Sequence, residues 1–502
     1  MIASILGGVM FFYPDNEYVI NENFTVKKFN YSDVFQSEEI EDKDITAILD
    51  VISDLQDLED VVEIDSIDSN CVDTIPAPIK KLEEVLKKNY RIQFPPDNKR
   101  ALAAFFAALK SKRDSSVIRI LHFGDSQIEG DRITSYLRRK FQSRFGGCGV
   151  GMVPVFELTE FRRTIFNERS DNWVKYPFYG LDYEPKFDRS FGLLGGYFAF
   201  TDLSVNDTNA VEQMDSSVVL LDSLSSDSVW ERPNVAVSID TGWFTLKRPY
   251  KKYRQKKTFD RITLMYGPVQ SEVSFELKDG EEVLRKKQLS VTSQFKTETI
   301  PFNGDFKSLK FSFIATESPQ VHGVALDCQG GVAVDNVGLR GSSGTEFTRI
   351  SRSFMSQELT QMNVKLIIFQ FGVNVVPGEL ENYDFIEKQY YRQLTRLKAL
   401  APDANILVVG VSDMSKKVDD HYETYSNVEM IRDAQKKAAF RAGCAFWDLY
   451  EVMGGENSMI SWVNNKPALA GKDYTHFTSR GAGFVAELLY NAIIREYESS
   501  GK

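Results

Sequence analysis

The sequence predicts an α/β fold: a five-stranded parallel sheet flanked by helices and interrupted by an inserted all-β domain. Two patterns predict it. Before about residue 155 and after residue 330, apolar strand-like runs alternate with helix-like runs, which is typical of a parallel sheet with helices on both faces. Between these segments, short runs of alternating apolar and polar residues replace the helices, which is typical of a β-sandwich or jelly roll.

Five apolar runs are the expected strands of the parallel sheet, at 117–121, 332–337, 364–371, 406–411 and 445–449. Helical spacing of apolar residues predicts helices at 102–112, 133–141, 346–361, 384–400, 428–441 and 483–494. In the inserted domain, strands are expected at 235–239, 262–266, 273–277 and 309–313, with a hairpin turn at 278–281.

These patterns divide the chain into four parts. Residues 1–95 hold an apolar N-terminus and an acidic linker, residues 96–155 and 330–502 are the two parts of one α/β domain, and residues 156–329 are the inserted sandwich. A chain of 502 residues is long enough for two or three domains that each bury a core of their own.

The N-terminal part is apolar at first and then strongly acidic. Residues 2–13 are too short to span a bilayer and lack the basic stretch that begins a secretory signal. They are either a buried segment or the remnant of an export signal or membrane anchor. Residues 33–73 carry many acidic side chains and one basic residue, Lys43. Such a run favours an extended, solvated chain, which we interpret as a linker, and a short helix is expected at 80–88.

Composition excludes some classes of function. The net charge of −11, without a basic stripe on a recognition fold, argues against a nucleic-acid partner. The cysteines are widely spaced and contain no CxxC pair: Cys71, Cys148, Cys328 and Cys444. We therefore expect neither a metal site nor a disulfide framework.

We expect a catalytic site at the end of the first strand of the parallel sheet, where Gly124-Asp125-Ser126 precedes a helix. In open α/β sheets, ligands bind in the crevice at this edge, and a helix N-terminus there would favour a developing negative charge. A serine hydroxyl needs a base, an orienting group for the base and oxyanion donors. His476 would be this base, and Asp473, three residues before it, would be the group that orients the base, as in a catalytic triad.

Donors for an oxyanion are expected where two other strands of the sheet end. A glycine-rich segment at 335–344, with Gly338 and Gly341, follows the second strand, and Asn374 follows the third. Glycine lets a backbone N–H approach a ligand closely, and an asparagine amide at a strand end can donate as a backbone amide does.

Four segments of the sequence, in this order, resemble the four blocks of the SGNH (GDSL-like) hydrolase superfamily: Gly124-Asp125-Ser126, the loop with Gly338 and Gly341, Gly372-Val373-Asn374, and Asp473-Tyr474-Thr475-His476. The resemblance implies that Ser126 is the nucleophile, His476 the general base and later acid, and Asp473 its orienting group. It implies an oxyanion hole made by the backbone N–H groups of Ser126 and Gly341 and the Asn374 amide.

The resemblance further implies a flavodoxin-like SGNH-hydrolase fold that needs no metal and no cofactor. The sequence departs from the family at two positions. Gln127 replaces the usual Leu, a side chain without chemistry, and Val375 stands where the family often has Asp.

An inserted sandwich at this position is similar to the peptidoglycan O-acetylesterases of bacterial envelopes, which carry a carbohydrate-binding-like module there. The resemblance implies an exported, periplasmic or cell-envelope esterase that acts on an acetylated glycan, with a possible N-terminal membrane tether. Two alternatives stay open: an O-acetyltransferase on the same triad, or a glycan-binding envelope protein without activity. The sequence gives no prediction of oligomeric state.

Several other residues could take part in chemistry or binding but are given no catalytic role. His122 is expected to pack in the first strand, and His322 and His421 are given no chemistry. Glu129 and Asp131 are interpreted as acids of the first helical turn, with a substrate contact as the alternative. Aromatic residues of the insertion are expected to be mostly core, with sugar stacking as the alternative: Trp173, Tyr176, Phe178, Tyr179, Trp243 and Phe244.

Overall fold

The computed structural model describes residues 17–21, 24–27, 90–111, 116–157, 162, 164–180, 183–184, 189–201, 239–248, 259–303 and 306–500. The expectations for residues 2–13, 33–73, 80–88 and most of 235–239 lie outside this part of the chain. Near the N-terminus, β1 (Glu17–Asn21) and β2 (Phe24–Lys27) pair as an antiparallel hairpin. None of the helices that the structure describes combines the length and apolar character that a membrane crossing requires.

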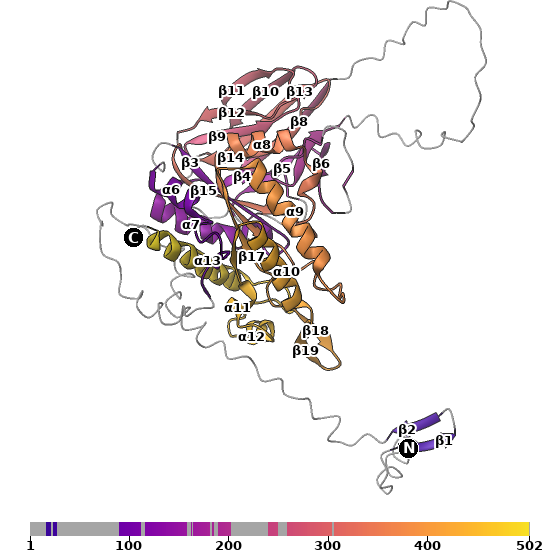
Figure 1. Cartoon of the computed structure of the whole chain (residues 1–502). Helices are drawn as coiled ribbons and strands as arrows, with labels where there is room; N and C mark the ends of the chain where they lie inside the picture. The colour runs from indigo at the N-terminus through magenta and orange to yellow at the C-terminus, as the bar shows by residue number, and fades with distance from the viewer. Residues whose placement is uncertain are drawn as a thin grey trace, which may run out of the picture.

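The centre of the molecule is a five-stranded parallel sheet, as predicted (Figure 1). Its strands lie in the order β15 (Gly331–Gly338), β3 (Val117–Gly124), β16 (Val364–Gln370), β17 (Asn405–Val409) and β20 (Ala445–Trp447), and every pairing is parallel. All eight residues of β3 are buried. Strands covered on both faces read as near-continuous apolar runs, which is why the sequence reveals them.

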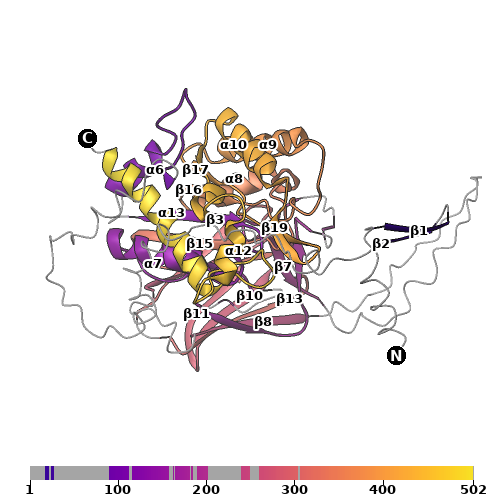
Figure 2. The ribbon, with the colours of Figure 1, turned by 90° about the horizontal axis from the view of Figure 1, so that it is seen from below.

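Helices cover both faces of this sheet (Figure 2). One face packs against α6 (Ala103–Ser111), α7 (Thr134–Phe145) and α13 (Ser479–Ser499), and the other packs against α8 (Arg352–Gln361), α9 (Asp384–Leu400) and α10 (Val428–Arg441). Short elements follow the strand ends: β18 (Ser415–Val418), β19 (His421–Thr424), α11 (Leu449–Met453) and α12 (Ser458–Asn464).

Two predicted helices differ from those observed. The helix expected at 346–361 is divided into a 3₁₀ turn, η5 (Phe347–Arg349), and α8, because Ile350 is extended and Ser351 caps α8 by accepting from the Phe354 N–H. The helix expected at 133–141 is α7, which begins at Thr134, but a 3₁₀ turn that was not predicted, η2 (Glu129–Asp131), lies between β3 and this helix.

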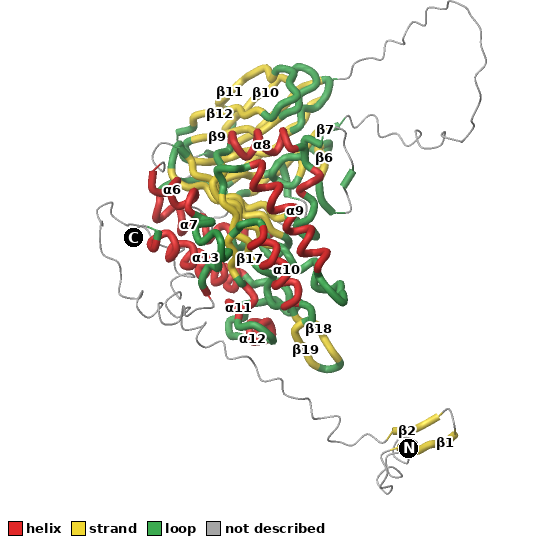
Figure 3. Tube along the Cα trace, in the orientation of Figure 1, coloured by secondary structure: helices red, strands yellow, loops and turns green. Residues whose placement is uncertain are grey.

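The inserted domain is a sandwich of two antiparallel sheets, and its strands β10, β11 and β12 lie near the top of Figure 3. One sheet has the order β11 (Glu282–Leu289), β10 (Val273–Asp279), β13 (Ser308–Ala315), β8 (Asp240–Lys247) and β5 (Phe166–Arg169). The other has β12 (Lys296–Pro301), β9 (Arg261–Tyr266), β14 (Val321–Asp327), β7 (Gly196–Phe200) and β6 (Trp173–Pro177), with β4 (Gly151–Val153) paired to β14. The expected hairpin turn joins β10 to β11, and Gly280 has the positive φ of 61° that such a turn requires.

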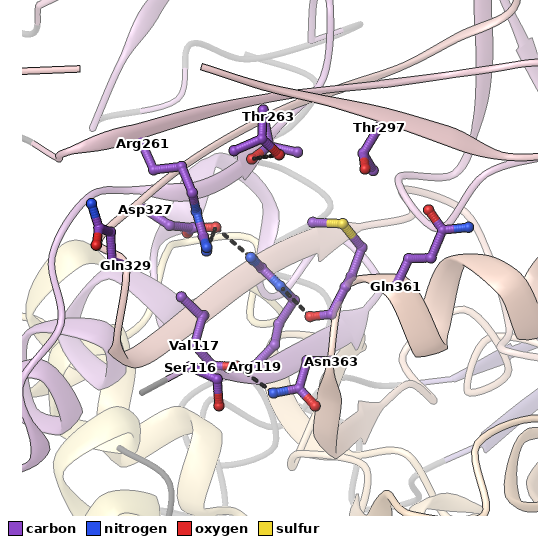
Figure 4. A pocket seen from close by; sticks show the side chains of 12 residues that line it. Ser116, Val117, Arg119, Arg261, Thr263, Thr297, Asp327, Gln329, Gln361 and Asn363 are labelled. Atoms are coloured by element: carbon purple, nitrogen blue, oxygen red, sulfur yellow. Dashed lines mark hydrogen bonds and ion pairs between the residues drawn. The ribbon is translucent and has the colours of Figure 1, made fainter. Parts of the chain in front are cut away.

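Two interactions connect the sandwich to the parallel sheet. Arg119 of β3 is buried and pairs with Asp327 of β14 (Figure 4) and with Asp335 of β15. Cys148 and Cys328 form a disulfide, so the expectation of no disulfide was wrong. Spacing along the chain could not reveal this pair, because 180 residues separate the two cysteines.

Candidate active site

Three side chains that lie far apart in the sequence form one chain of hydrogen bonds. Ser126 Oγ lies 2.8 Å from His476 Nε2, and His476 Nδ1 lies 2.7 Å from Asp473 Oδ2. Because an ionised carboxylate only accepts, Nδ1 carries the ring proton and donates to Asp473, which leaves Nε2 to accept from the serine hydroxyl. Ser126 is largely buried, at 9% exposed.

The segment that carries His476 is held by Asp473. One oxygen of Asp473 accepts from the backbone N–H groups of Thr475 and His476, while the other accepts from the imidazole. Partial burial would raise the pKa of Asp473, but the hydrogen bonds from the His476 backbone and ring outweigh burial and hold the pKa below its ordinary value. The carboxylate is therefore ionised at neutral pH.

The turn that carries Ser126 is held by its neighbour Asp125. Asp125 Oδ1 accepts from the Gln127 N–H and Oδ2 accepts from the Gly372 N–H, at 3.0 and 3.1 Å. Burial raises the pKa of Asp125 to about 6, although these backbone N–H groups oppose the rise. Asp125 thus joins the end of β3 to the segment that follows β16.

Gln127 makes a second connection that the sequence did not reveal. Its side-chain amide donates to the Thr475 carbonyl at 2.7 Å and to Ser412 Oγ at 3.0 Å. The side chain is 2% exposed. The glutamine stands where the family usually has an apolar leucine. Because a buried amide requires hydrogen-bond partners, this substitution could have indicated a polar contact.

Asn374 lies in a turn that the Val375 N–H closes by donating to the Gly372 carbonyl. Its side-chain amide donates to the Ser342 carbonyl at 2.9 Å. An asparagine amide has two N–H donors, so this bond fixes the side chain and leaves the second donor for a ligand. The backbone of residue 375, rather than its side chain, holds this turn.

Gly341 lies three residues beyond β15, whose last residue, Gly338, pairs with Gly124 of β3. The chain therefore carries Gly341 past the same sheet edge as Ser126. Gly341 has a φ of 80°, and a Cβ there would meet no atom within 4 Å. The space beside its backbone is open to a ligand. The loop is shorter than expected, because residues 335–338 belong to β15.

The helix-dipole argument for Ser126 was wrong. The residues expected in a first helical turn lie in η2, where Gly130 and Asp131 have positive φ. Asp131 is fully buried and pairs with Arg138 and Arg162, and Glu129 pairs with Arg340. These acids are structural partners of arginines rather than acids of a helix terminus. The α7 dipole acts mainly on its own first turn and does not reach Ser126.

Two of the other three histidines, His122 and His322, are buried in the structure. His122 is fully buried between Thr134 Oγ1 and Gln370 Oε1, and burial lowers its pKa to about 4. The packed role expected for it is confirmed. His322 is buried and lies 2.6 Å from the Gly267 carbonyl, and His421 lies in β19.

The aromatic residues of the sandwich are mostly core, as expected. Four of the six are buried, Trp173, Phe178, Tyr179 and Phe244, while Tyr176 and Trp243 are half-buried. Among the described residues, the one group of potential metal-ligating side chains with donor atoms close together is Cys148, Asp260 and Cys328. Its sulfurs are joined in the disulfide, so they offer no thiolate to a metal.

The geometry favours nucleophilic chemistry. A hydroxyl that donates to an imidazole, itself oriented by a carboxylate, can lose its proton as it attacks an electrophilic carbon. Two groups able to donate to an oxyanion, the Gly341 N–H and the Asn374 amide, follow the neighbouring strands β15 and β16. The sheet order brings these segments to the carboxyl edge on either side of β3.

Comparison with known proteins identifies the fold. A model of the GDSL-like lipase/acylhydrolase family matches residues 317–483, a range that contains Gly341, Asn374, Asp473 and His476 but not Ser126, and that begins before β14, the last strand of the sandwich. A solved structure described as a peptidoglycan O-acetylesterase in action matches with a TM-score of 0.59 and 18% identity, over 82% of this chain and 99% of that one.

Two further solved structures share less. An acetyl xylan esterase matches with a TM-score of 0.26 and 20% identity, over 32% of this chain and 81% of that one. A family two carbohydrate esterase from Clostridium thermocellum, in complex with cellohexaose, matches with a TM-score of 0.23 and 10% identity, over 47% of this chain and 90% of that one. No curated protein matches the chain.

Proposed function

We propose that this chain, in which residues 317–483 match a model of the GDSL-like lipase/acylhydrolase family, is a serine esterase that removes O-acetyl groups from a cell-envelope polysaccharide, namely peptidoglycan. The observation that carries the proposal is the hydrogen-bonded chain from Ser126 through His476 to Asp473, at 2.8 and 2.7 Å.

In the proposed reaction, Ser126 Oγ attacks the acetyl carbonyl carbon while His476 Nε2 takes the hydroxyl proton. The oxyanion of the tetrahedral intermediate accepts from the backbone N–H groups of Ser126 and Gly341 and from the Asn374 amide. The intermediate collapses as His476 returns the proton to the departing sugar oxygen, which leaves acetyl-Ser126. A water that gives its proton to His476 then attacks this ester, and acetate departs.

Asp473 acts through His476. Its carboxylate keeps the ring proton on Nδ1 and stabilises the imidazolium that forms when Nε2 takes a proton. Since its pKa is held below the ordinary value, Asp473 carries the negative charge that this role requires throughout the neutral range.

The choice of an acetylated envelope glycan rests on two observations. The solved structure that this chain resembles over 82% of its length is described as a peptidoglycan O-acetylesterase. In addition, the disulfide between Cys148 and Cys328 is typical of proteins that fold outside the reducing cytosol. This pairing supports export, which an enzyme acting on the cell envelope needs.

A comparison of three substrates tests the proposal. Acetate release is measured from O-acetylated peptidoglycan, acetylated xylan and a small aryl acetate, with the unaltered protein and with Ser126→Ala. We expect the highest kcat/KM on peptidoglycan and loss of release from all three with Ser126→Ala, which keeps its fold by circular dichroism. A preference for xylan would overturn the substrate, and unchanged activity of Ser126→Ala would overturn the mechanism.

A further inference from the structure

Tyr474 lies inside the segment that carries Asp473 and His476, and its backbone conformation is uncommon. Its φ of 52° falls in the left-handed region, which residues with a Cβ rarely adopt. The turn at Tyr474 brings the N–H groups of Thr475 and His476 back to one oxygen of Asp473, at 3.1 and 3.0 Å. The orientation of the imidazole therefore depends on a backbone conformation that the surrounding structure has to hold in place.

The hairpin of β18 and β19 contacts Tyr474 at two points. The ring of Tyr422, in β19, stacks face to face on the ring of Tyr474, with centroids 3.5 Å apart and planes within 11° of parallel. Both tyrosines are half-buried. In β18, the Ser415 N–H donates to the Tyr474 carbonyl at 3.1 Å. One strand of the hairpin thus holds the ring of Tyr474, and the other holds its backbone.

The hairpin is itself anchored at its base by Asp413, a buried carboxylate just before β18. Asp413 accepts from Thr424 Oγ1, at the end of β19, at 2.8 Å and from the Met459 N–H of α12 at 2.7 Å. Figure 1 shows β18 and β19 at the end of the α/β domain that lies away from strands β10 and β11 of the sandwich. Because its base is fixed to α12, the hairpin can serve as a firm support for Tyr474.

The stack is strong enough to matter for the turn. An aromatic pair contributes a free energy of the same order as the cost of one left-handed residue. Losing the ring of Tyr422 would therefore allow Tyr474 to leave the left-handed region in a substantial fraction of molecules.

We propose that Tyr422 is a positioning residue for His476, and that it acts by holding Tyr474 in the left-handed conformation. The inference rests on the proposed function, because it concerns the same imidazole. Without the stack, the N–H groups of the two residues after Tyr474 turn away from Asp473, and fewer molecules hold Nε2 against the serine hydroxyl. A smaller competent fraction lowers kcat and leaves KM unchanged.

The test replaces the ring of Tyr422. Tyr422→Leu removes the aromatic face but keeps an apolar side chain, and Tyr422→Phe keeps the ring without its hydroxyl. The matched control is Tyr497→Leu, at a half-buried tyrosine near the end of α13 that packs edge-on against Phe106 and Phe145. For each variant, kcat and KM are measured on a small aryl acetate, and the fold is checked by circular dichroism.

We expect Tyr422→Leu to lower kcat by about three- to tenfold with KM unchanged, while Tyr422→Phe and Tyr497→Leu keep the kcat of the unaltered protein. In a Tyr474→Asn background, Tyr422→Leu should cost nothing further, because the ring that it supports is gone and asparagine tolerates the left-handed region. Four outcomes overturn the inference: an unchanged kcat of Tyr422→Leu, a loss that Tyr422→Phe shares, a rise in KM instead, or an equal loss in both backgrounds.

A second measurement separates this inference from the proposed function. Phenylmethanesulfonyl fluoride modifies a serine hydroxyl that a neighbouring base activates, so the rate at which Ser126 is modified, followed by mass spectrometry, reports on His476 without a sugar substrate. We expect Tyr422→Leu to react about three- to tenfold more slowly than the unaltered protein. Equal rates overturn the inference alone, whereas an unaltered protein that is not modified at Ser126 overturns the proposed function and the inference together.

Discussion

The side-chain amide of Gln127 donates a hydrogen bond to the backbone carbonyl of Thr475, at 2.7 Å across 348 positions of the sequence. The donor is next to Ser126 and the acceptor is next to His476. A single side chain therefore fixes the distance between the two segments that must meet for the hydroxyl to reach the imidazole.

Replacing Gln127 with Leu, the residue usual in the family, should lower kcat on an aryl acetate by about five- to tenfold, because a net hydrogen bond is worth about 1 kcal/mol. The matched control is Gln142→Leu, which removes an amide that also donates to a backbone carbonyl, that of Gly149, in a different part of the molecule. Equal activity of the two variants would show that Gln127 does not position the site.

Asp473→Asn tests the orienting carboxylate. An amide can turn its NH₂ group toward the ring and so reverse the imidazole tautomer, and we expect kcat to fall by roughly 10³-fold or more. Asp433→Asn, which removes a surface partner of Arg432, serves as the control and should keep full activity. A loss of less than tenfold in Asp473→Asn would refute the triad.

Asn374→Ala removes a proposed oxyanion donor and should lower kcat by about 10²–10³-fold with little change in KM, since the amide acts mainly in the transition state. Asn167→Ala is the control: its amide also donates to a backbone carbonyl, that of Val155 in the sandwich. Should KM rise while kcat stays constant, Asn374 would be a binding residue instead.

Glu358 predicts a pH dependence of stability. It is fully buried in α8, accepts from the Leu193 N–H, and burial raises its pKa to about 8. Because this is above the ordinary value, the folded state favours the neutral acid, and its contribution is complete below about pH 4.5 and lost as the pH rises through about 8.

Glu358→Gln keeps the shape and the acceptor but cannot ionise. Relative to this variant, the unaltered protein should lose on the order of a few kcal/mol of unfolding free energy between about pH 5 and pH 8, measured by urea denaturation. Glu281→Gln, on the exposed turn between β10 and β11, should show the pH profile of the unaltered protein. Parallel profiles for all three proteins would contradict the assignment.

Removing the disulfide with Cys148→Ser and Cys328→Ser should lower stability by about 2–4 kcal/mol, seen as a lower thermal midpoint. Aryl acetate turnover at low temperature should persist, because neither cysteine touches Ser126 or His476. The control is Cys444→Ser, at a buried free thiol, which keeps the disulfide, so its thermal midpoint should still fall when reductant is added. A midpoint of the unaltered protein that is insensitive to reductant would argue against the pairing.

The apolar strands of the parallel sheet could be predicted, because burial on both faces leaves an uninterrupted pattern of the kind seen in β3. The 3₁₀ turn η2 before α7 was not predicted; within it, Asp131 has a positive φ and pairs with Arg138 and with Arg162, a residue beyond β4. Local helical spacing carries no information about that distant partner.

In the candidate active site, too, the sequence could predict some features and not others. Ser126, His476 and Asp473 could be named because their chemistry is local to short segments, and the structure brings them into hydrogen-bond contact. The sequence could not show that Thr475 is the partner of the Gln127 amide or that Cys148 pairs with Cys328. Each of these contacts joins residues that lie far apart in the sequence, on either side of the inserted sandwich, so no short segment of the sequence reveals it.

Three residues, 328–330, separate the last strand of the sandwich from β15, and the first of them is anchored to Cys148. The sandwich therefore has no hinge at this connection, and a rotation of the sandwich relative to the sheet would also move β15. At its other end β15 leads to the loop that holds Gly341, so a tilt of the sandwich relative to the sheet would displace that loop.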